Sequence, residues 1–522
     1  MNIRDRLRLD IEKEISGDGD KDRFEVTRTE NSRFGDFATN IALKRNGNPK
    51  EIPEEIAGEL KDLDYLEKVE VAGPGFINFW VKPSVWQEQI KEVLDQKSLY
   101  GSNSIGKGKK ARVEFVSANP TGPLHFGNAR GGPIGDALAS VLELSGYEVL
   151  REYYHNDIGG QVEKLGQTIV NVKNGANLED QEYKGEYIKG LVKQIGDFSN
   201  PQEAGKKALE IILKTILSDC KALGISFDKV YSESEFIKSG KTESSLKKVA
   251  KFLKKREGAT WFVPNDQFLK DRETVVIKSD GFYTYFADDI AYHDLKFGEK
   301  YDLVVDILGA NHHGHVPRLQ AAIKALGYDV SKFHVVLYQW VRFKKGKEIL
   351  KMSKRSGTFI TASEVLDEVG VDAARFFILM HDASSHIDFD LDLASRKSKE
   401  NPVYYVQYAY ARISSILAKV GKKLKLENVD YRLLTTEYEL NLIRETTKFP
   451  ELIEVVAKGF AVHRLATYAI ELADSFHKFY ENCPVISDDE NLQNARLGLI
   501  NAAKIAFGNT LSLLGISAPE KM

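Results

Sequence analysis

The hydrophobic and polar positions at the start of the chain predict a small α+β domain. The opening residues repeat with the period of an amphipathic helix, and the turn-bounded run EVAGPGFINFWV has the alternating apolar residues of a strand. The segment SLYGSNSIGKGKK that follows is rich in Ser, Gly and Lys and has no hydrophobic periodicity, which is typical of a linker. We therefore expect residues 1–105 to form a first domain.

The pattern in the middle of the chain predicts a Rossmann-like domain over residues 106–394. ARVEFVSAN predicts a strand, TGPLHFGNARGG a turn, and PIGDALASVLELSGYEV a helix that ends at Gly146. A second strand at VLREYYHND completes a βαβ unit, the element from which parallel sheets are built. TVVIKS, YDLVVDILGA and FHVVLYQWV predict further strands, and the polar stretch at about residues 166–223 predicts a helical insertion.

The last part of the chain has long amphipathic patterns and almost no strand signals. YYVQYAYARISSILAKV, ELNLIRETTKFPELIEVVAK and RLATYAIELADSFHKFYENC all predict helices, so residues 395–522 are expected to form an all-helical domain. The expected fold class is therefore α/β, with a parallel-sheet domain between an α+β domain and a helical one. A chain of 522 residues is long enough for several domains.

Composition and charge leave this picture intact and exclude some classes of protein. The chain is 42% hydrophobic and 29% charged, as folded proteins are, and its net charge of -3 means that any contact with nucleic acid must come from local basic patches. Two cysteines, Cys220 and Cys483, cannot form a disulfide framework or a Cys-rich zinc site. The start MNIRDRLRLDIEKEI does not resemble a signal peptide, and no uncharged run reaches roughly 20 residues. We expect a cytoplasmic protein without a membrane span.

The glycine-rich turn in the middle stretch is suited to bind an anion. A strand that enters a helix through such a turn presents free backbone N–H groups and the positive end of the helix dipole, which favour phosphate. His125 and Asn128 are three residues apart and share a face on a first helical turn, while Gly127 has no Cβ to obstruct a ligand. Such turns also serve many α/β folds as structure alone. The sequence matches neither GxGxxG nor GxxxxGKS, which disfavours a dinucleotide fold and a P-loop.

A second candidate element lies in KKGKEILKMSKRSGTF. Six basic residues fall within twelve positions there, against the single acid Glu348. A charge run is most often a solvated surface. Ammonium groups on a glycine-hinged loop can also neutralise the charge that develops on a leaving pyrophosphate, and Lys351 and Lys354 are the candidates for this role.

These two elements resemble the signatures of class I aminoacyl-tRNA synthetases. His125-Phe126-Gly127-Asn128 is similar to HIGH, with departures at the second and fourth positions, and the segment from Lys351 to Lys354 matches KMSK without departure. The resemblance implies ATP-dependent formation of an aminoacyl-adenylate. It also implies two sets of residues, catalytic His125, Asn128, Lys351 and Lys354, and ATP-binding Gly127, Met352 and Ser353.

Four further segments are similar to the arginyl-tRNA synthetases: VEFVSANPTGPLHFGN, REYYHNDIGGQ, NPVYYVQYAYARI and LLGISAPEKM. A guanidinium presents five donors in a plane, which calls for carboxylates and a flat partner. Tyr285 and Asp289 match the pair that recognises the arginine side chain in that family, although alone they also fit a surface pair. The resemblance implies three more contacts to arginine, Glu233 at the side chain, and Glu114 and Asn119 at the α-amino and carboxylate ends.

The run GANHHGHVPR has three closely spaced histidines, which suit a metal or a nucleotide. A zinc site needs further ligands and no cysteine lies nearby, so no protein-bound zinc or other metal is expected. The resemblance implies that His312 and His315 contact ATP. Mg²⁺ is expected to arrive with ATP, held largely by its phosphates.

The resemblance also implies a tRNA partner, tRNA(Arg), alongside L-arginine and ATP. The anticodon loop would meet the helical domain, where interleaved Tyr and Arg can stack bases and hold phosphates. The implied contacts are Tyr404, Tyr408 and Arg412 in that domain, and Phe76 and Asn78 in the first domain at the tRNA D-loop corner. Tyr468, His477 and Tyr480 are further candidates, and we expect at least half of the C-terminal set to be buried packing.

Three alternatives remain open at this point. A different class I synthetase is disfavoured by the lack of zinc cysteines and of a long editing insertion. A HIGH-type nucleotidyltransferase would not need the helical domain, and a catalytically silent tRNA-binding paralogue would not need His125, Lys351 and Lys354. We take a monomeric enzyme as the expectation.

Overall fold

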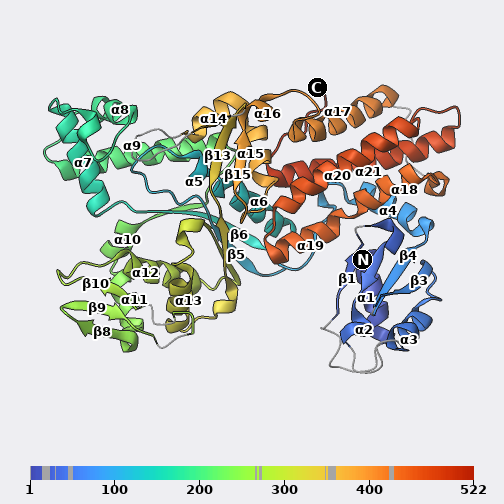
Figure 1. Ribbon diagram of the computed structural model, residues 1–522, viewed down its shortest axis with the longest axis horizontal. Coiled ribbons are helices and arrows are strands. Elements are labelled where there is room, and N and C mark those ends of the chain that lie inside the picture. The colour runs from blue at the N-terminus through green and yellow to red at the C-terminus, as the bar shows by residue number, and fades with distance from the viewer. Residues whose placement is uncertain are drawn as a thin grey trace.

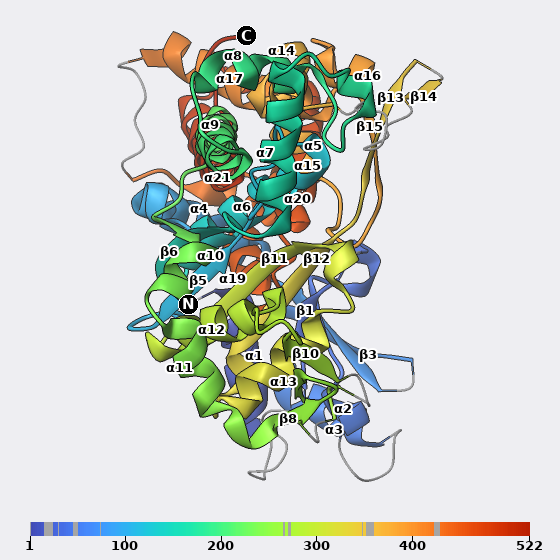
Figure 2. The ribbon, with the colours of Figure 1, turned by 90° about the vertical axis from the view of Figure 1, so that its left-hand side faces the viewer.

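The computed structural model describes residues 2–14, 24–29, 31–44, 51–73, 75–264, 267–269, 273–346, 348–350, 360–421 and 428–522. In Figure 1 the N-terminal section lies at the lower right, the C-terminal helices lie above it, and the middle of the chain fills the centre and the left. The side view of Figure 2 shows the strands of the central sheet between the helices above and the smaller elements below.

Five parallel strands form the sheet at the centre, in the order β12-β11-β5-β6-β7. Their bounds are β5 Lys110–Glu114, β6 Glu148–His155, β7 Lys229–Ser232, β11 Leu303–Gly309 and β12 Phe333–Tyr338. The chain moves from β5 outward to β7 and then returns to the other side of β5 for β11 and β12. In such sheets a ligand binds beyond the carboxyl ends of the strands where the order reverses. Here that place is the space beyond β5 and β11.

The predicted βαβ unit is confirmed. Helix α6, Gly131–Leu144, connects β5 to β6 and follows the short helix α5, Phe126–Ala129. Gly135 allows α6 to approach the sheet, since a Cβ there would lie 2.3 Å from the ring of Phe115. TVVIKS is also a strand, β10, but it belongs to a different sheet.

That second sheet belongs to the elements drawn at the lower left of Figure 1. Its strands are antiparallel, in the order β10-β9-β8. The bounds are β8 Leu253–Arg256, β9 Ala259–Phe262 and β10 Thr274–Ile277. The helices beside it are α10 Glu233–Lys238, α11 Lys241–Lys248, α12 Tyr285–Gly298 and α13 Val316–Ala325.

The polar stretch of chain that follows β6 is helical. It contains α7 Gly160–Lys173, α8 Glu186–Ile195 and α9 Pro201–Ala222. Two glycines let α7 and α9 touch through their backbones. A Cβ on Gly166 would lie 1.8 Å from the Pro201 carbonyl oxygen, and one on Gly205 would lie 2.3 Å from that of Val162.

The N-terminal section is an antiparallel four-stranded sheet with helices, as the pattern predicts. The sheet order is β1-β2-β4-β3, and the predicted strand FINFWV is β4. The strand bounds are β1 Val26–Arg28, β2 Phe37–Thr39, β3 Leu66–Ala72 and β4 Phe76–Val81. The helices are α1 Ile3–Glu14, α2 Ile41–Lys44, α3 Glu51–Leu60 and α4 Pro83–Gln96.

The predicted C-terminal helices form a bundle behind a small three-stranded sheet. The sheet contains β13 Val341–Lys345, β14 Glu348–Leu350 and β15 Ile387–Asp390, and its helices are α14 Ala362–Val369, α15 Val371–Leu379 and α16 Leu391–Ser395. The bundle contains α17 Pro402–Val420, α18 Glu437–Thr447, α19 Phe449–Gly459, α20 His463–Asn482 and α21 Glu490–Leu514. Among the described helices, α21 alone is long and apolar enough to cross a membrane, but 67% of its apolar window is buried inside the fold. It is therefore a core helix of the bundle.

Arg375 on α15 ties the bundle to the central domain. Its side chain is fully buried and donates to the carbonyl oxygens of Leu514 at 2.7 Å and Leu223 at 2.8 Å. The same guanidinium donates to Asp136 on α6 at 2.7 Å. One side chain thus joins α6, α15, the end of α9 and the end of α21.

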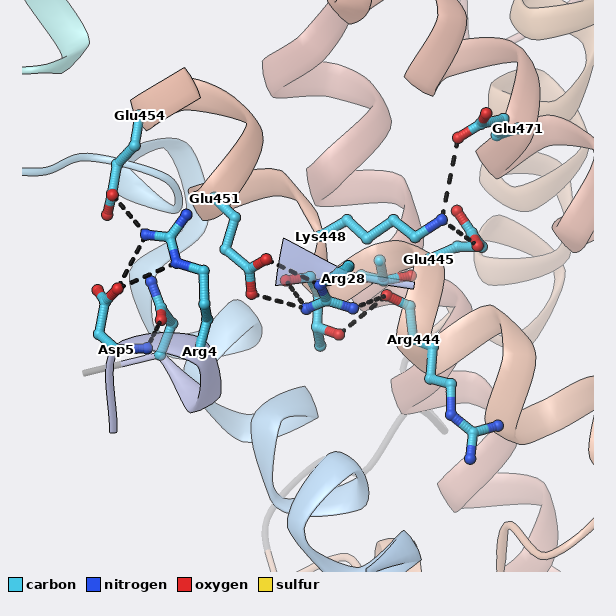
Figure 3. A network of polar contacts seen from close by, with 12 residues as sticks. Arg4, Asp5, Arg28, Arg444, Glu445, Lys448, Glu451, Glu454 and Glu471 are labelled. Atoms are coloured by element: carbon cyan, nitrogen blue, oxygen red, sulfur yellow. Dashed lines mark hydrogen bonds and ion pairs between the residues drawn. The ribbon is translucent and has the colours of Figure 1, made fainter. Parts of the chain in front are cut away.

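A polar network holds the N-terminal section against the bundle (Figure 3). Arg28 on β1 forms a bidentate ion pair with Glu451 on α19, at 2.9 and 3.0 Å, and its guanidinium also lies 5.0 Å from the ring centroid of Trp86 on α4. Arg444 on α18 pairs with Asp36 at 2.9 Å. Because Arg28 and Glu451 are mostly shielded from solvent, removing either partner would leave the other charge buried and unpaired, which costs more than the loss of a surface ion pair.

Candidate active site

A cavity of about 790 Å³ opens at the carboxyl ends of β5 and β11. Residues from β5, the turn before α5, α12, β11 and the segment before α13 line it, so the chain brings together positions far apart in sequence. Eight of the residues chosen from the sequence are on its wall: Glu114, Asn119, His125, Asn128, Tyr285, Asp289, His312 and His315. This is the place at which a doubly wound sheet binds its ligand.

The turn that contains His125 is fixed by the chain that follows the KMSK segment. Phe126 N–H donates to Ile360 O at 3.1 Å, and Ala362 N–H donates to Leu124 O at 2.9 Å. His125 caps the N-terminal end of α5, and a Cβ on Gly127 would meet no atom within 4 Å, which leaves room for a ligand. Lys351, Met352, Ser353 and Lys354 lie outside the described residues. Ile360, the first described residue after that segment, is hydrogen-bonded to the His125 turn.

Helix α12 presents two predicted arginine contacts one turn apart. Tyr285 is its first residue and is half exposed, and Asp289 follows four positions later on the same face. His315 Nε2 lies 2.8 Å from Asp289 Oδ2. Burial lowers the pKa of His312, and the nearby His315 adds to the effect. The histidine segment and helix α12 therefore meet at Asp289.

An acid pair lies beside Asp289. Glu233 begins α10 and is buried with 4% of its surface exposed, and it shares a hydrogen bond with Asp288. Burial raises the pKa of Glu233 to about 9, with Asp288 adding to the shift, and burial raises that of Asp288 to about 6. One oxygen of Glu233, Oε2, is buried without a hydrogen-bond partner. Among the described residues, no Lys or Arg pairs with Glu233, Asp288 or Asp289, and the ion-pair partner of Asp289 is His315.

A second group of acids forms the floor of the cavity, and it does contain a cation. Lys296 of α12 is fully buried and donates to Glu114 Oε2 and, at 2.6 Å, to Asp306 Oδ1. Its Nζ also lies 3.4 Å from Glu152 Oε1. Burial acts to raise the pKa of Asp306, but Lys296 and His293 together outweigh it and the pKa falls to about 2.

The sequence patterns missed several residues of this wall. Tyr154, Tyr292, His293, Asp306 and Trp340 all line the cavity. Helical spacing was a usable signal on α12, because His293 is four positions beyond Asp289. The residues on strands and loops had no comparable signal.

The predicted RNA contacts lie on two other surfaces. Tyr404 and Tyr408 line a small cavity of about 220 Å³ on α17. Arg412 donates to the Tyr408 hydroxyl, and its guanidinium lies 5.3 Å from the ring centroid of Tyr480. Of the C-terminal candidates only Tyr468 is buried, so the expectation that half would be packing was wrong. In the N-terminal section Phe76 is exposed, whereas Asn78 is buried in the sheet.

Three family models match the chain in order. They are the arginyl tRNA synthetase N terminal domain over residues 1–81, the class I (R) tRNA synthetase catalytic domain over residues 89–214 and 176–388, and the DALR anticodon binding domain over residues 406–522. An arginine--tRNA ligase of Carboxydothermus hydrogenoformans is 43% identical over 98% of this chain and 96% of its own. One from Citrifermentans bemidjiense is 41% identical over the whole of both chains. The solved arginyl-tRNA synthetase of Thermus thermophilus has the same fold, with a TM-score of 0.83, 22% identity and complete coverage of both chains.

Proposed function

The chain belongs to the class I arginyl-tRNA synthetases, and from this premise we propose which of its residues carry the reaction. It is an arginine--tRNA ligase, which uses ATP to attach arginine to tRNA(Arg) in translation. The observation that supports the residue assignment is the cavity at the sheet reversal, whose wall contains His125, Asp289 and His315. The acids Glu233 and Asp288 lie beside Asp289. The wall offers carboxylates on β5 and α12 and imidazoles before α5 and α13, and the two kinds of group meet where His315 contacts Asp289.

Arginine would bind with its guanidinium at Asp289, Glu233 and Tyr285. The carboxylates supply acceptors for the planar donors, and Tyr285 supplies a flat partner. The unpartnered Oε2 of Glu233 is the kind of buried acceptor that a guanidinium N–H would satisfy. The α-ammonium would bind Glu114, and the carboxylate would lie near Asn119.

ATP would occupy the opposite side of the cavity. Backbone and side chains at His125, Gly127 and Asn128 would hold the phosphates, and His312 and His315 would face the nucleotide. We also propose that Lys351 and Lys354, with Met352 and Ser353 between them, stabilise the pyrophosphate as it leaves and the arginyl-adenylate forms. The pairing of Ile360 with the His125 turn supports this arrangement, because residue 360 lies six positions after Lys354.

The tRNA would contact both ends of the chain. The half-exposed group Tyr404, Tyr408 and Arg412 suits unstacked anticodon bases, and the exposed Phe76 suits the D-loop corner, with Asn78 supporting its strand. Mg²⁺ would come with ATP and be held by phosphates. We propose three functional domains, residues 1–105, 106–394 and 395–522, in a monomer that acts in the cytoplasm away from membranes.

ATP–pyrophosphate exchange tests this proposal. We expect exchange with arginine and not with lysine or citrulline, and we expect it to require tRNA(Arg). Asp289→Ala should raise the arginine KM by about 10- to 100-fold, because a charge-assisted hydrogen bond contributes ~1.5–3 kcal/mol. ATP binding should be unchanged. The exposed Asp280, in the turn before α12, serves as the control as Asp280→Ala, and equal arginine KM values for the two variants would disprove the assignment.

A further inference from the structure

Lys296 lies beneath the cavity wall, and it is unusual because it is a lysine with no exposed surface. It lies on α12 seven positions beyond Asp289, so the same helix that reads the guanidinium end continues beneath the cavity. Its ammonium contacts three carboxylates, on β5, β6 and β11. Burying a lysine costs free energy unless its charge is paired, and these three carboxylates pair with Lys296.

The contact with Lys296 uses one of the two carboxylate oxygens of Glu114. Glu114 lines the cavity, and its Oε2 accepts from Lys296 Nζ. Its second oxygen, Oε1, has no hydrogen-bond donor among the described residues. Lys296 therefore holds the carboxylate by one oxygen, and the other oxygen is left for a ligand in the cavity.

Lys296 also acts on the charge of Glu114. Burial raises the pKa of the Glu114 carboxyl, and the Lys296 ammonium acts in the opposite direction. Asp306 and Glu152 act in the same direction as burial, so the pKa of Glu114 is raised overall and would rise further without the ammonium. A neutral carboxyl offers a cation a much weaker hydrogen bond than a carboxylate does.

We propose that Lys296 is a positioning residue for the amino-acid substrate, which holds the Glu114 side chain oriented to receive the α-ammonium group of arginine. The proposal rests on the proposed contact between Glu114 and that ammonium. It implies that α12 serves both ends of the substrate, directly through Asp289 and indirectly through Lys296. The enzyme would thereby discriminate against guanidino compounds that lack an α-amino group.

The test is the affinity of two ligands for the full-length enzyme, measured by isothermal titration calorimetry. L-Arginine has the α-amino group, and 5-guanidinopentanoate lacks only that group. We expect wild-type enzyme to bind arginine at least about 10-fold more tightly, a difference of about 1.4 kcal/mol. In Lys296→Met the ratio of the two Kd values should fall to within about 3-fold, while the Kd of 5-guanidinopentanoate stays within about 3-fold of wild type.

The ratio of the two Kd values distinguishes a positioning role of Lys296 from a merely structural one. General damage to the cavity would weaken the binding of both ligands and leave the ratio unchanged. Lys248→Met is the matched control, because Lys248 also pairs with an acid of α12, Asp294, which lies off the cavity wall. It should keep the wild-type ratio. Lys296→Met with the wild-type ratio would overturn the proposal.

Glu114→Gln tests the proposed contact between Glu114 and the α-ammonium separately from the role of Lys296. If Glu114→Gln loses the ratio and Lys296→Met keeps it, the role of Lys296 alone is refuted. If Glu114→Gln also keeps the ratio, the contact between Glu114 and the α-ammonium is itself wrong. Should Lys296→Met fail to fold, Lys296→Met/Asp306→Asn removes one charge of each sign from the floor and must show the same loss of ratio for the proposal to stand.

Discussion

Arginine binding should release a proton from Glu233. In the empty cavity burial and the neighbouring Asp288 raise the pKa of Glu233 to about 9, so the group holds a proton at pH 7. A guanidinium placed against it favours the ionised form and lowers the pKa. Below about pH 9 the free enzyme must lose that proton when arginine binds. The affinity for arginine should therefore increase with pH.

The magnitude follows from the shift. Removing a proton costs ~1.4 kcal/mol for each pH unit below the pKa, which is ~2.7 kcal/mol at pH 7 for a pKa of about 9. The arginine Kd should thus fall by up to about 100-fold between pH 7 and pH 9. This window lies above the pKa of Asp288, which is about 6, so the neighbour is already ionised and adds little.

Calorimetry in two buffers of different ionisation enthalpy measures the proton directly. Near pH 7.5 we expect the wild-type enzyme to release close to one proton per arginine bound. Glu233→Gln keeps the shape and cannot ionise, so it should release none and show a flat pH profile after the titration of the ligand's own α-amino group is subtracted. Glu235→Gln, on the exposed side of α10, should behave as wild type. Wild-type binding without proton release would refute the reasoning.

Two further predictions concern stability. Gly166→Ala should destabilise the insertion by ~1–3 kcal/mol, because the added Cβ meets the backbone of α9. Gly160→Ala on the same helix, where nothing lies within 4 Å, should be neutral or slightly stabilising. Thermal unfolding compares the two variants, and equal Tm values would contradict the close contact between the helices. Arg28→Ala leaves Glu451 shielded and unpaired, which should cost ~3 kcal/mol of contact between the N-terminal section and the bundle. Scanning calorimetry should then show an earlier transition for the N-terminal section, and an unchanged profile would show that the network in Figure 3 contributes little.

The central sheet could be predicted where its strands are continuous apolar runs. A buried parallel strand is a continuous apolar run, and β11 and β12 have that pattern. Strand β7, Lys229–Ser232, lies at the edge and is largely polar, so it gives no such signal. The run TVVIKS was recognised as a strand, but a hydrophobic pattern reports burial and not the identity of the partner strand. Its pairing with β9 in a separate sheet could therefore not be predicted from the sequence.

The candidate site was predictable where a motif marks it and obscure elsewhere. Glu233 also fits a solvated loop in the sequence, yet it is buried because α10 packs against α12. Lys296 resembles an ordinary surface lysine in the sequence, since only the three-dimensional arrangement places three carboxylates around it. Buried charge therefore has to be read from the tertiary structure.

The two acid groups differ in what balances their charge. One group, Glu233 with Asp288, would face the guanidinium end of arginine, and Glu114 of the other would face the α-ammonium end. At the guanidinium end no Lys or Arg pairs with Glu233 or Asp288 among the described residues, and a proton takes the place of a cation. At the floor Lys296 is the cation, and it pairs with Glu114 and Asp306. Arginine and 5-guanidinopentanoate have the same guanidinium, so both should displace the proton of Glu233. Only arginine can respond to the loss of Lys296, because only arginine brings an ammonium to Glu114.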